Sequence, residues 1–170
     1  AVSRIDGRWM DEAQLRQLLA GQKPAKLLHD FETGRPDQWG QTQGGAAAQA
    51  QLDFAATGPD GAGKALHCLV PSFESWDTLI APAVEAPFAP GSTLTCLWAK
   101  GGPDTQSLGL EWVERDGSRW IATIPLAEQW QHYALTPRQF SYWRDNPSTG
   151  RGGSGDRFRP ESAVRLTIGL

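Results

Sequence analysis

Residues 107–125 read Ser-Leu-Gly-Leu-Glu-Trp-Val-Glu-Arg-Asp-Gly-Ser-Arg-Trp-Ile-Ala-Thr-Ile-Pro, and this stretch decides the fold class. Apolar residues alternate with other residues on both sides of Asp116-Gly117, which predicts two half-buried strands, Ser107–Arg115 and Arg119–Pro125. Asp-Gly supplies the positive φ angles of a tight hairpin turn. The stretch therefore predicts an antiparallel β-hairpin.

The same period of two continues through most of the chain. Further strands are predicted at Lys26–Glu32, Ala47–Ala55, Ala65–Pro71, Thr78–Val84, Ser92–Lys100, Gln131–Leu135 and Ala163–Leu170, each bounded by Gly, Pro, Asp or Asn. Alternation predicts core-facing positions at Leu94, Cys96, Trp98, Leu108, Leu110, Trp112, Val164, Leu166 and Ile168. Short strands without a βαβ rhythm predict an all-β protein, an antiparallel β-sandwich of the jelly-roll type.

One helix is predicted, over Met10–Ala20, with Asp11 as its cap and Gly21 at its end. This divides the chain into an N-terminal extension at 1–25 and a β-sandwich domain at 26–170. The final strand looks like the penultimate strand of a jelly roll. We therefore expect its free edge to be filled by Val2–Ile5 or by another chain or domain.

Composition excludes several classes of protein. The formal net charge is −3 over 170 residues, which argues against a nucleic-acid surface, and no apolar run is long enough to span a membrane. Eight tryptophans are more than a small core needs. A surplus indole offers a flat apolar face on which a sugar ring stacks, whereas the alternative is simple burial in a Trp-rich sandwich.

Local motifs for catalysis or metal binding are weak. Residues 58–64 have the spacing of a phosphate-binding loop, but Ala65 stands where Ser or Thr is required and a strand follows, so a glycine-rich turn is the better interpretation. Glu111 points opposite to Glu114 and Asp116 by alternation, which disfavours a glycosidase-type carboxylate pair. The three histidines share no local spacing.

The two cysteines, Cys68 and Cys96, lie in predicted strands and on predicted core faces. We expect free buried thiols, with a disulfide between the two strands as the alternative. Asp30 and Glu32 alternate with apolar residues, a pattern that suits either a structural calcium ion at the edge of a sandwich or a polar outward face. No other cofactor is indicated.

The connection from Thr136 to Pro160 is long for a compact domain. It carries four aromatic residues and five arginines, whereas disordered linkers contain few aromatic residues. We therefore expect an ordered loop packed on the sandwich.

Three segments together resemble carbohydrate-binding modules with the galactose-binding-like jelly roll. Leu27–Glu32 followed by Trp39 resembles the opening segment of such modules, Leu94–Gly101 resembles their central strand, and Trp130–Leu135 resembles the strand before the last loop. The resemblance covers Leu27 to Leu170 and implies the fold more than the ligand. The chain departs from the family pattern by lacking a further last strand and by its larger aromatic and arginine-rich loop.

The resemblance implies a non-catalytic carbohydrate-binding module of a larger, secreted, polysaccharide-acting protein, located outside the cell or in the periplasm. Its partners would be an oligo- or polysaccharide and the other domains of that protein, with neither nucleic acid nor membrane. The alternatives are a structural or interdomain sandwich without ligand, and a jelly-roll glycosidase or lyase. The predicted ligand-binding residues are Trp76, Asp77, Tyr142, Trp143, Arg144, Asp145, Arg151, Asp156 and Arg157, and the candidate metal ligands are Asp30 and Glu32.

Overall fold

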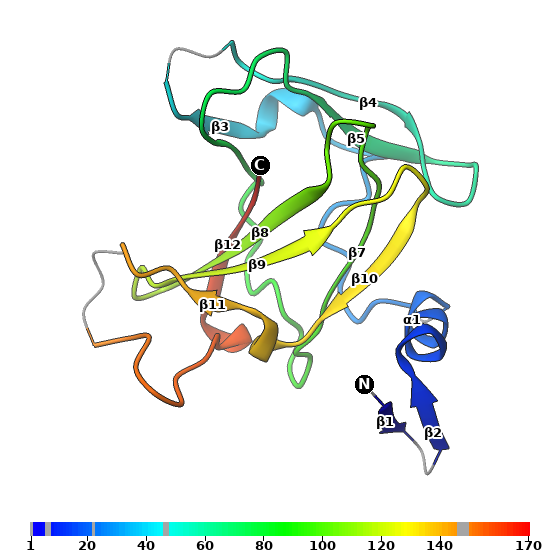
Figure 1. The fold of residues 1–170 in the computed structure, drawn as a ribbon, viewed down its shortest axis with the longest axis vertical. Helices are drawn as coiled ribbons and strands as arrows, with labels where there is room; N and C mark the ends of the chain where they lie inside the picture. The colour runs from blue at the N-terminus through cyan, green and yellow to red at the C-terminus, as the bar shows by residue number, and fades with distance from the viewer. Residues whose placement is uncertain (1, 6–7, 22, 46–47, 146–149) are drawn as a thin grey trace.

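The hairpin at residues 107–125 lies at the centre of the molecule (Figure 1). Strands β8 (Ser107–Glu114) and β9 (Arg119–Pro125) pair antiparallel, with Trp112 opposite Trp120. The turn differs from the expected tight one. Only Gly117 has a positive φ there, of 84°, and the N–H of Glu114 donates to the carbonyl of Ser118 at 2.9 Å. The connection is therefore a longer turn that ends in a left-handed glycine.

The computed structural model describes residues 2–5, 8–21, 23–45, 48–145 and 150–170. One layer of the sandwich is a six-stranded antiparallel sheet in the order β11 (Ser141–Tyr142), β9, β8, β12 (Ala163–Gly169), β6 (Asp77–Ile80) and β3 (Gly40–Gln43). Two strand pairs form the second layer: β7 (Thr95–Ala99) with β10 (Gln131–Leu135), and β4 (Gln51–Thr57) with β5 (Lys64–Leu69). The predicted antiparallel sandwich is confirmed.

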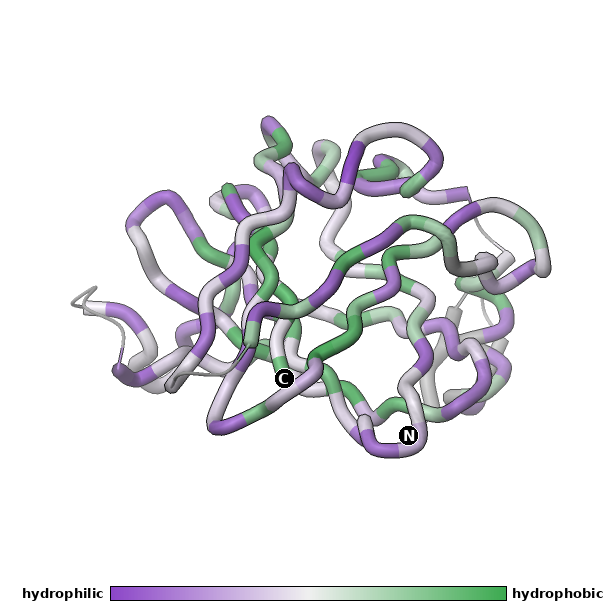
Figure 2. The backbone as a smooth tube through the Cα atoms, turned by 90° about the horizontal axis from the view of Figure 1, so that it is seen from above, coloured by the Kyte–Doolittle hydropathy of each residue, from purple (hydrophilic) through white to green (hydrophobic). Residues whose placement is uncertain are grey.

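The core lies between these layers in two clusters. The larger one, beneath β7 and β10, is built on Leu110, Trp112, Trp120, Ile124 and Phe158. The smaller one, beneath β4 and β5, is built on Trp39, Leu79 and Ala81. Figure 2 shows hydrophobic residues concentrated along the central strands and hydrophilic residues in the peripheral loops.

The predicted face of β7 is wrong. Thr95 and Ala99 are buried and Leu97 packs against the core, whereas Leu94, Cys96 and Trp98 are exposed. The indole N–H of Trp112 donates to the hydroxyl of Thr95 at 2.9 Å, which fixes the inward face of the strand. Both cysteines are free and exposed, so neither the buried thiols nor the disulfide is found.

Strand β12 pairs with β8 on one side and with β6 on the other. The expectation that it leaves a free edge for Val2–Ile5 or another chain to fill is therefore wrong, and β1 (Val2–Ile5) pairs with β2 (Arg8–Asp11) instead. An irregularity in the register after Ala163 turns Val164 outward, so its predicted core position is also wrong, while Leu166 and Ile168 pack inward as expected.

The predicted helix is present as α1 (Glu12–Ala20), and its first expected residues belong to β2. The carboxylate of Asp11 accepts the N–H of Gln14 at 2.8 Å, which completes the expected cap. The helix contacts β10 (Figure 1). Short 3-10 turns occur at Pro36–Gln38 (η1), Pro137–Gln139 (η2) and Pro160–Ser162 (η3).

Residues 26–32 form no strand, contrary to expectation. The carboxylate of Asp30 accepts the main-chain N–H groups of Glu32 and Thr33, at 3.1 and 3.3 Å, and Phe31 has a φ of 60°. This Asx-type turn competes with an extended backbone. Within the described residues, no helix has the length and apolarity needed to cross a membrane.

Candidate functional site

The six-stranded sheet has one face that is turned away from the second layer, and we call it the outer face. Because side chains alternate along a strand, the register determines which residues share this face. They are Gly40, Thr42, Thr78, Ile80, Ser107, Gly109, Glu111, Val113, Arg119, Ile121, Thr123, Pro125, Ser141, Arg165, Thr167 and Gly169.

One row of the outer face combines hydroxyl groups with a flat floor. Gly109 lies opposite Thr123 on one side and Gly169 on the other, and Gly169 and Thr42 both lie opposite Thr78. The two glycines leave the backbone uncovered at the centre of the row, while threonine hydroxyls flank it. A hydroxyl both donates and accepts, so this row suits a flat ligand that carries many hydroxyl groups.

A carboxylate–guanidinium pair stands beside this row. Nε and Nη2 of Arg119 donate to the two carboxylate oxygens of Glu111 at 2.9 and 2.6 Å, in the fork geometry that makes such pairs strong. Glu111 is only 7% exposed, and a half-buried Arg119 covers it. The pair is a rigid polar feature on the sheet surface.

Trp143 stands at the β11 edge of this face, next to the pair. The main-chain N–H of Trp143 donates to the carbonyl of Arg119 at 2.8 Å, and the Arg119 guanidinium lies 5.7 Å from the centre of the indole ring. The indole is nevertheless 41% exposed. Trp143 is thus held in position with part of its ring open to solvent.

Trp76 stands near the opposite edge, 46% exposed. Gly44 donates its N–H to the carbonyl of Trp76 at 2.9 Å, which continues the β3–β6 pairing by one residue and places Trp76 on the outer face by alternation. A Cβ added to Gly44 would lie 2.6 Å from the indole nitrogen, so the glycine makes room for this ring. The neighbouring Asp77 is buried and accepts two hydrogen bonds from the amide of Gln41.

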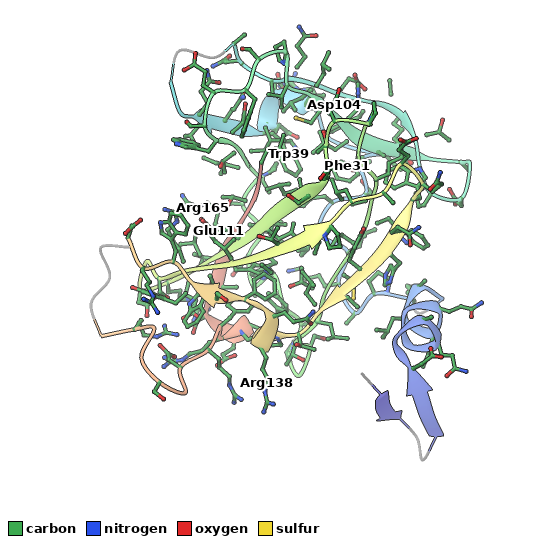
Figure 3. All side chains as sticks on the ribbon, in the orientation of Figure 1. Phe31, Trp39, Asp104, Glu111, Arg138 and Arg165 are labelled. Atoms are coloured by element: carbon green, nitrogen blue, oxygen red, sulfur yellow. The ribbon has the colours of Figure 1, made fainter. Side chains whose placement is uncertain are left out.

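A hollow of about 510 Å³ opens on the same face, lined by Gln38, Gly40, Ile80, Pro82, Val113 and Arg165 among others. Figure 3 shows Arg165 and Glu111 close together on the side of β8 that is turned away from β10. The outer face therefore offers a hollow, a polar pair and exposed indoles at two edges.

Arg151, a predicted ligand contact in the arginine-rich loop, is engaged by acidic side chains of the protein itself. Nη1 of Arg151 donates to Glu114 at 2.6 Å and to Asp116 at 2.7 Å, and its Nε donates to Asp156 at 2.8 Å. Its guanidinium also lies 5.2 Å from the centre of the Trp120 ring. With its side chain 8% exposed and its donors engaged, Arg151 links the loop to the central hairpin.

These contacts change the pKa values of the group. Glu114 and Asp156 raise the pKa of Arg151. A hydrogen bond from Ser118 lowers the pKa of Asp116 to about 2, and the hydrogen bond from Arg151 lowers that of Asp156 to about 2. Both carboxylates therefore remain charged down to acidic pH.

Lowered carboxyl pKa values make the loop network sensitive to acid. Since these pKa values are about 2 in the folded state and start from 3.8, the network stabilises the protein above pH 3.8 and loses this contribution as the pH falls toward 2. We expect the melting temperature to fall over this range. In Asp156→Asn the melting temperature should fall less steeply with pH. Identical pH profiles for the variant and the parent would contradict the assignment of this acid sensitivity to the loop network.

The other predicted site residues are dispersed. Tyr142 faces the core edge and meets Trp120 edge-on, with 5.4 Å between ring centres. Arg144, Asp145 and Arg157 are exposed. Asp77 begins β6 and Trp76 directly precedes it, and β6 is separated from β11 by β9, β8 and β12, about 19 Å at the usual strand spacing.

Asp30 and Glu32, the candidate metal ligands, accept main-chain hydrogen bonds, Glu32 from the N–H of Lys64. Across the described residues, no three His, Cys, Asp or Glu side chains are grouped so as to hold a metal ion. The two carboxylates do not fit a calcium site by themselves.

A second hollow, of about 400 Å³, opens between the layers near Asp30. Its aromatic lining includes His29, Phe31, Trp39 and Phe54; the centres of the Phe31 and Phe54 rings are 5.3 Å apart. Burial lowers the pKa of His29. Gln38 and Pro82 line both hollows, so the two are adjacent.

Comparison with known proteins bears on the fold. No protein-family model and no curated protein matches the sequence. Among solved structures, one similar chain is the family 11 carbohydrate-binding module from Clostridium thermocellum in complex with a β-1,3-1,4-mixed-linked tetrasaccharide. The TM-score is 0.60 at 14% identity, over 84% of each chain.

The chain has the fold of a family 11 carbohydrate-binding module. Another similar structure, the family 11 carbohydrate-binding module of the cellulosomal cellulase Lic26A-Cel5E of Clostridium thermocellum, gives a TM-score of 0.55 at 12% identity, over 84% of this chain and 89% of the other. The sequence resemblance to carbohydrate-binding modules is thereby supported at the level of fold.

The sequence prediction missed most of the outer face of this module fold. Arg119, Arg165 and the threonine row carry no local motif. Alternation is the signal that could have found them. On β8 and β9, the residues of the outer face alternate along each strand with the correctly predicted core residues. Strand β12 brings the row together by pairing with β8 and β6, and no local sequence pattern predicts this pairing.

Proposed function

We propose that the chain is a non-catalytic carbohydrate-binding module, which binds a polysaccharide along the outer face and acts outside the cell as part of a larger protein. The observation that carries the proposal is the pair of exposed indoles, Trp76 and Trp143, at two edges of one polar, glycine-floored sheet face. The tetrasaccharide-bound family 11 module supports it by similarity of fold.

Each part of the face has a role in this proposal. The indoles cover the C–H faces of sugar rings, while the sugar hydroxyls remain at the edges of the stack. The threonine row and the Glu111–Arg119 pair exchange hydrogen bonds with those hydroxyls. Because Arg119 already holds Glu111 in a fork, this carboxylate is a fixed acceptor and not a free general acid.

Trp143→Ala tests the proposal. Loss of a stacked indole should cost about 1–3 kcal/mol of binding free energy, which weakens binding by about 5- to 150-fold. Calorimetric titration with mixed-linkage β-glucan, xylan and uronate-containing oligosaccharides measures the change. The melting temperature should stay near that of the parent, because the ring is 41% exposed.

Trp98→Ala is the matched control. Trp98 is 43% exposed, yet it lies on the outward side of β7 in the second layer, where its ring meets His132. Its loss should leave glycan affinity unchanged. Equal effects of the two variants would place the sugar elsewhere, and release of reducing ends by the parent protein would replace the proposal with an enzymatic one.

A further inference from the structure

One end of the outer face is basic. Val113 on β8 has Arg119 opposite it on β9 and Arg165 opposite it on β12. Arg115 follows at the end of β8, and its N–H donates to the carbonyl of Ser162 at 2.9 Å, just before β12 begins. Three arginines therefore gather around one apolar residue of the sheet.

The acids nearby neutralise Arg119 but neither Arg115 nor Arg165 among the described residues. Glu111 engages Arg119 only, and Arg151 holds Glu114, Asp116 and Asp156. In the part of the chain that the structure describes, neither Arg115 nor Arg165 forms an ion pair, and both are exposed. A positive patch thus stands on a chain whose formal net charge is −3.

The hollow beside this patch combines one positively charged side chain with a mainly apolar lining. Arg165 is the charged residue in its lining, and the rest consists of apolar side chains, a glycine and the amide of Gln38. A guanidinium binds a carboxylate through two parallel hydrogen bonds, which sets the orientation of the carboxylate as well as its affinity. Ile80 and Pro82 offer the apolar contact that the C–H face of a sugar ring needs.

We propose that the outer face selects an acidic polysaccharide, with a uronate ring in the hollow and its carboxylate on Arg165. This rests on the proposed function and narrows it to a ligand class. It differs from the mixed-linked tetrasaccharide bound by the family 11 module of similar fold.

The experiment compares three probes by calorimetric titration of the full chain: an oligogalacturonate, the same oligosaccharide as its methyl ester, and a mixed-linkage β-glucan oligosaccharide. The ester keeps the sugar backbone and removes the charge. We expect the acid to bind at least about tenfold more tightly than the ester, since a charge-assisted pair is lost. Raising the salt concentration from about 0.05 M to about 0.5 M should weaken the binding of the acidic oligosaccharide and leave the binding of the other two probes unchanged.

Arg165→Gln should remove the preference for acid over ester, and Arg138→Gln is the matched control. Arg138 is an exposed arginine on η2, distant from Arg165 in Figure 3, so its loss changes the net charge equally without touching the patch. Circular dichroism spectra of both variants should match the parent, because neither arginine is buried.

The outcomes separate this inference from the proposed function. Salt-insensitive binding of the β-glucan, with no preference for the acid, overturns the inference and leaves the proposed function standing. Preference for the acid that persists in Arg165→Gln also overturns it. If none of the three probes binds while the protein remains folded, the inference and the proposed outer-face function fail together.

Discussion

Arg151→Ala is expected to lower the free energy of unfolding by about 3–5 kcal/mol, the range for breaking a buried charge pair from one side. The substitution leaves Glu114, which is 1% exposed, without the guanidinium that neutralises it. Asp156 loses the nearer of its two guanidinium partners and keeps Arg159 at 3.7 Å, and Trp120 loses the cation above its ring. The N–H of Arg159 still donates to Glu114 at 2.8 Å, but one main-chain hydrogen bond does not balance a buried charge.

Urea denaturation followed by tryptophan fluorescence measures this effect, with Arg157→Ala as the control. Arg157 is exposed in the same loop, so its loss should change stability by no more than about 0.5 kcal/mol. Adding Glu114→Gln to Arg151→Ala should restore part of the stability, because the stranded charge is then removed. Equal midpoints for Arg151→Ala and the parent would show that the network does not hold the loop.

Phe158→Ala is expected to cost about 3–5 kcal/mol, the usual range for removing a large aromatic ring from a packed core. Phe158 is 1% exposed although it belongs to the long connection between β11 and β12. Its ring is stacked with Trp112 at a centroid distance of 6.1 Å and also contacts Phe88 and Phe140. The loop therefore supplies part of the main core.

The midpoints of thermal and urea unfolding should both fall strongly in Phe158→Ala. In Phe73→Ala, at an exposed phenylalanine, both midpoints should stay close to those of the parent. Phe158→Leu should recover much of the loss, because it keeps most of the apolar volume. A Phe158→Ala protein as stable as the parent would mean that the connection is a dispensable surface loop.

Local patterning accounts for the parts of the fold where it is unambiguous. On β8 and β9, the tryptophans and leucines share one parity, with Val113 and Ile121 as the apolar exceptions, so Leu110, Trp112 and the hairpin were predicted correctly. On β7 both parities are apolar, and alternation alone does not select a face. There the hydrogen bond from Trp112 to Thr95, a contact between distant segments, decides the orientation of the strand.

The same limit applies to the candidate site. Trp76 and Trp143 were predicted as ligand contacts because both indoles lie in connections between strands. That both stand on the same face of one sheet follows from the strand order. Arg151 and Asp156 were placed with them because arginine and aspartate in a glycine-rich loop suit sugar hydroxyls. Their mutual ion pair arises from the fold of the loop back onto Glu114, which no local spacing reveals.

The outward orientation of Cys96 gives the molecule a chemical handle. It lies in the second layer, so a probe or a solid support coupled to its sulfur would be attached on the side of the sandwich that is opposite the outer face. Desolvation raises the pKa of Cys96, and desolvation and the Asp77 carboxylate raise the pKa of the other thiol, Cys68, to about 11, so very little of either is thiolate at neutral pH. A Cys68→Ser variant would carry a single attachment point, and the protein could be immobilised in one orientation with its tryptophan-edged face directed toward a solution of glycans.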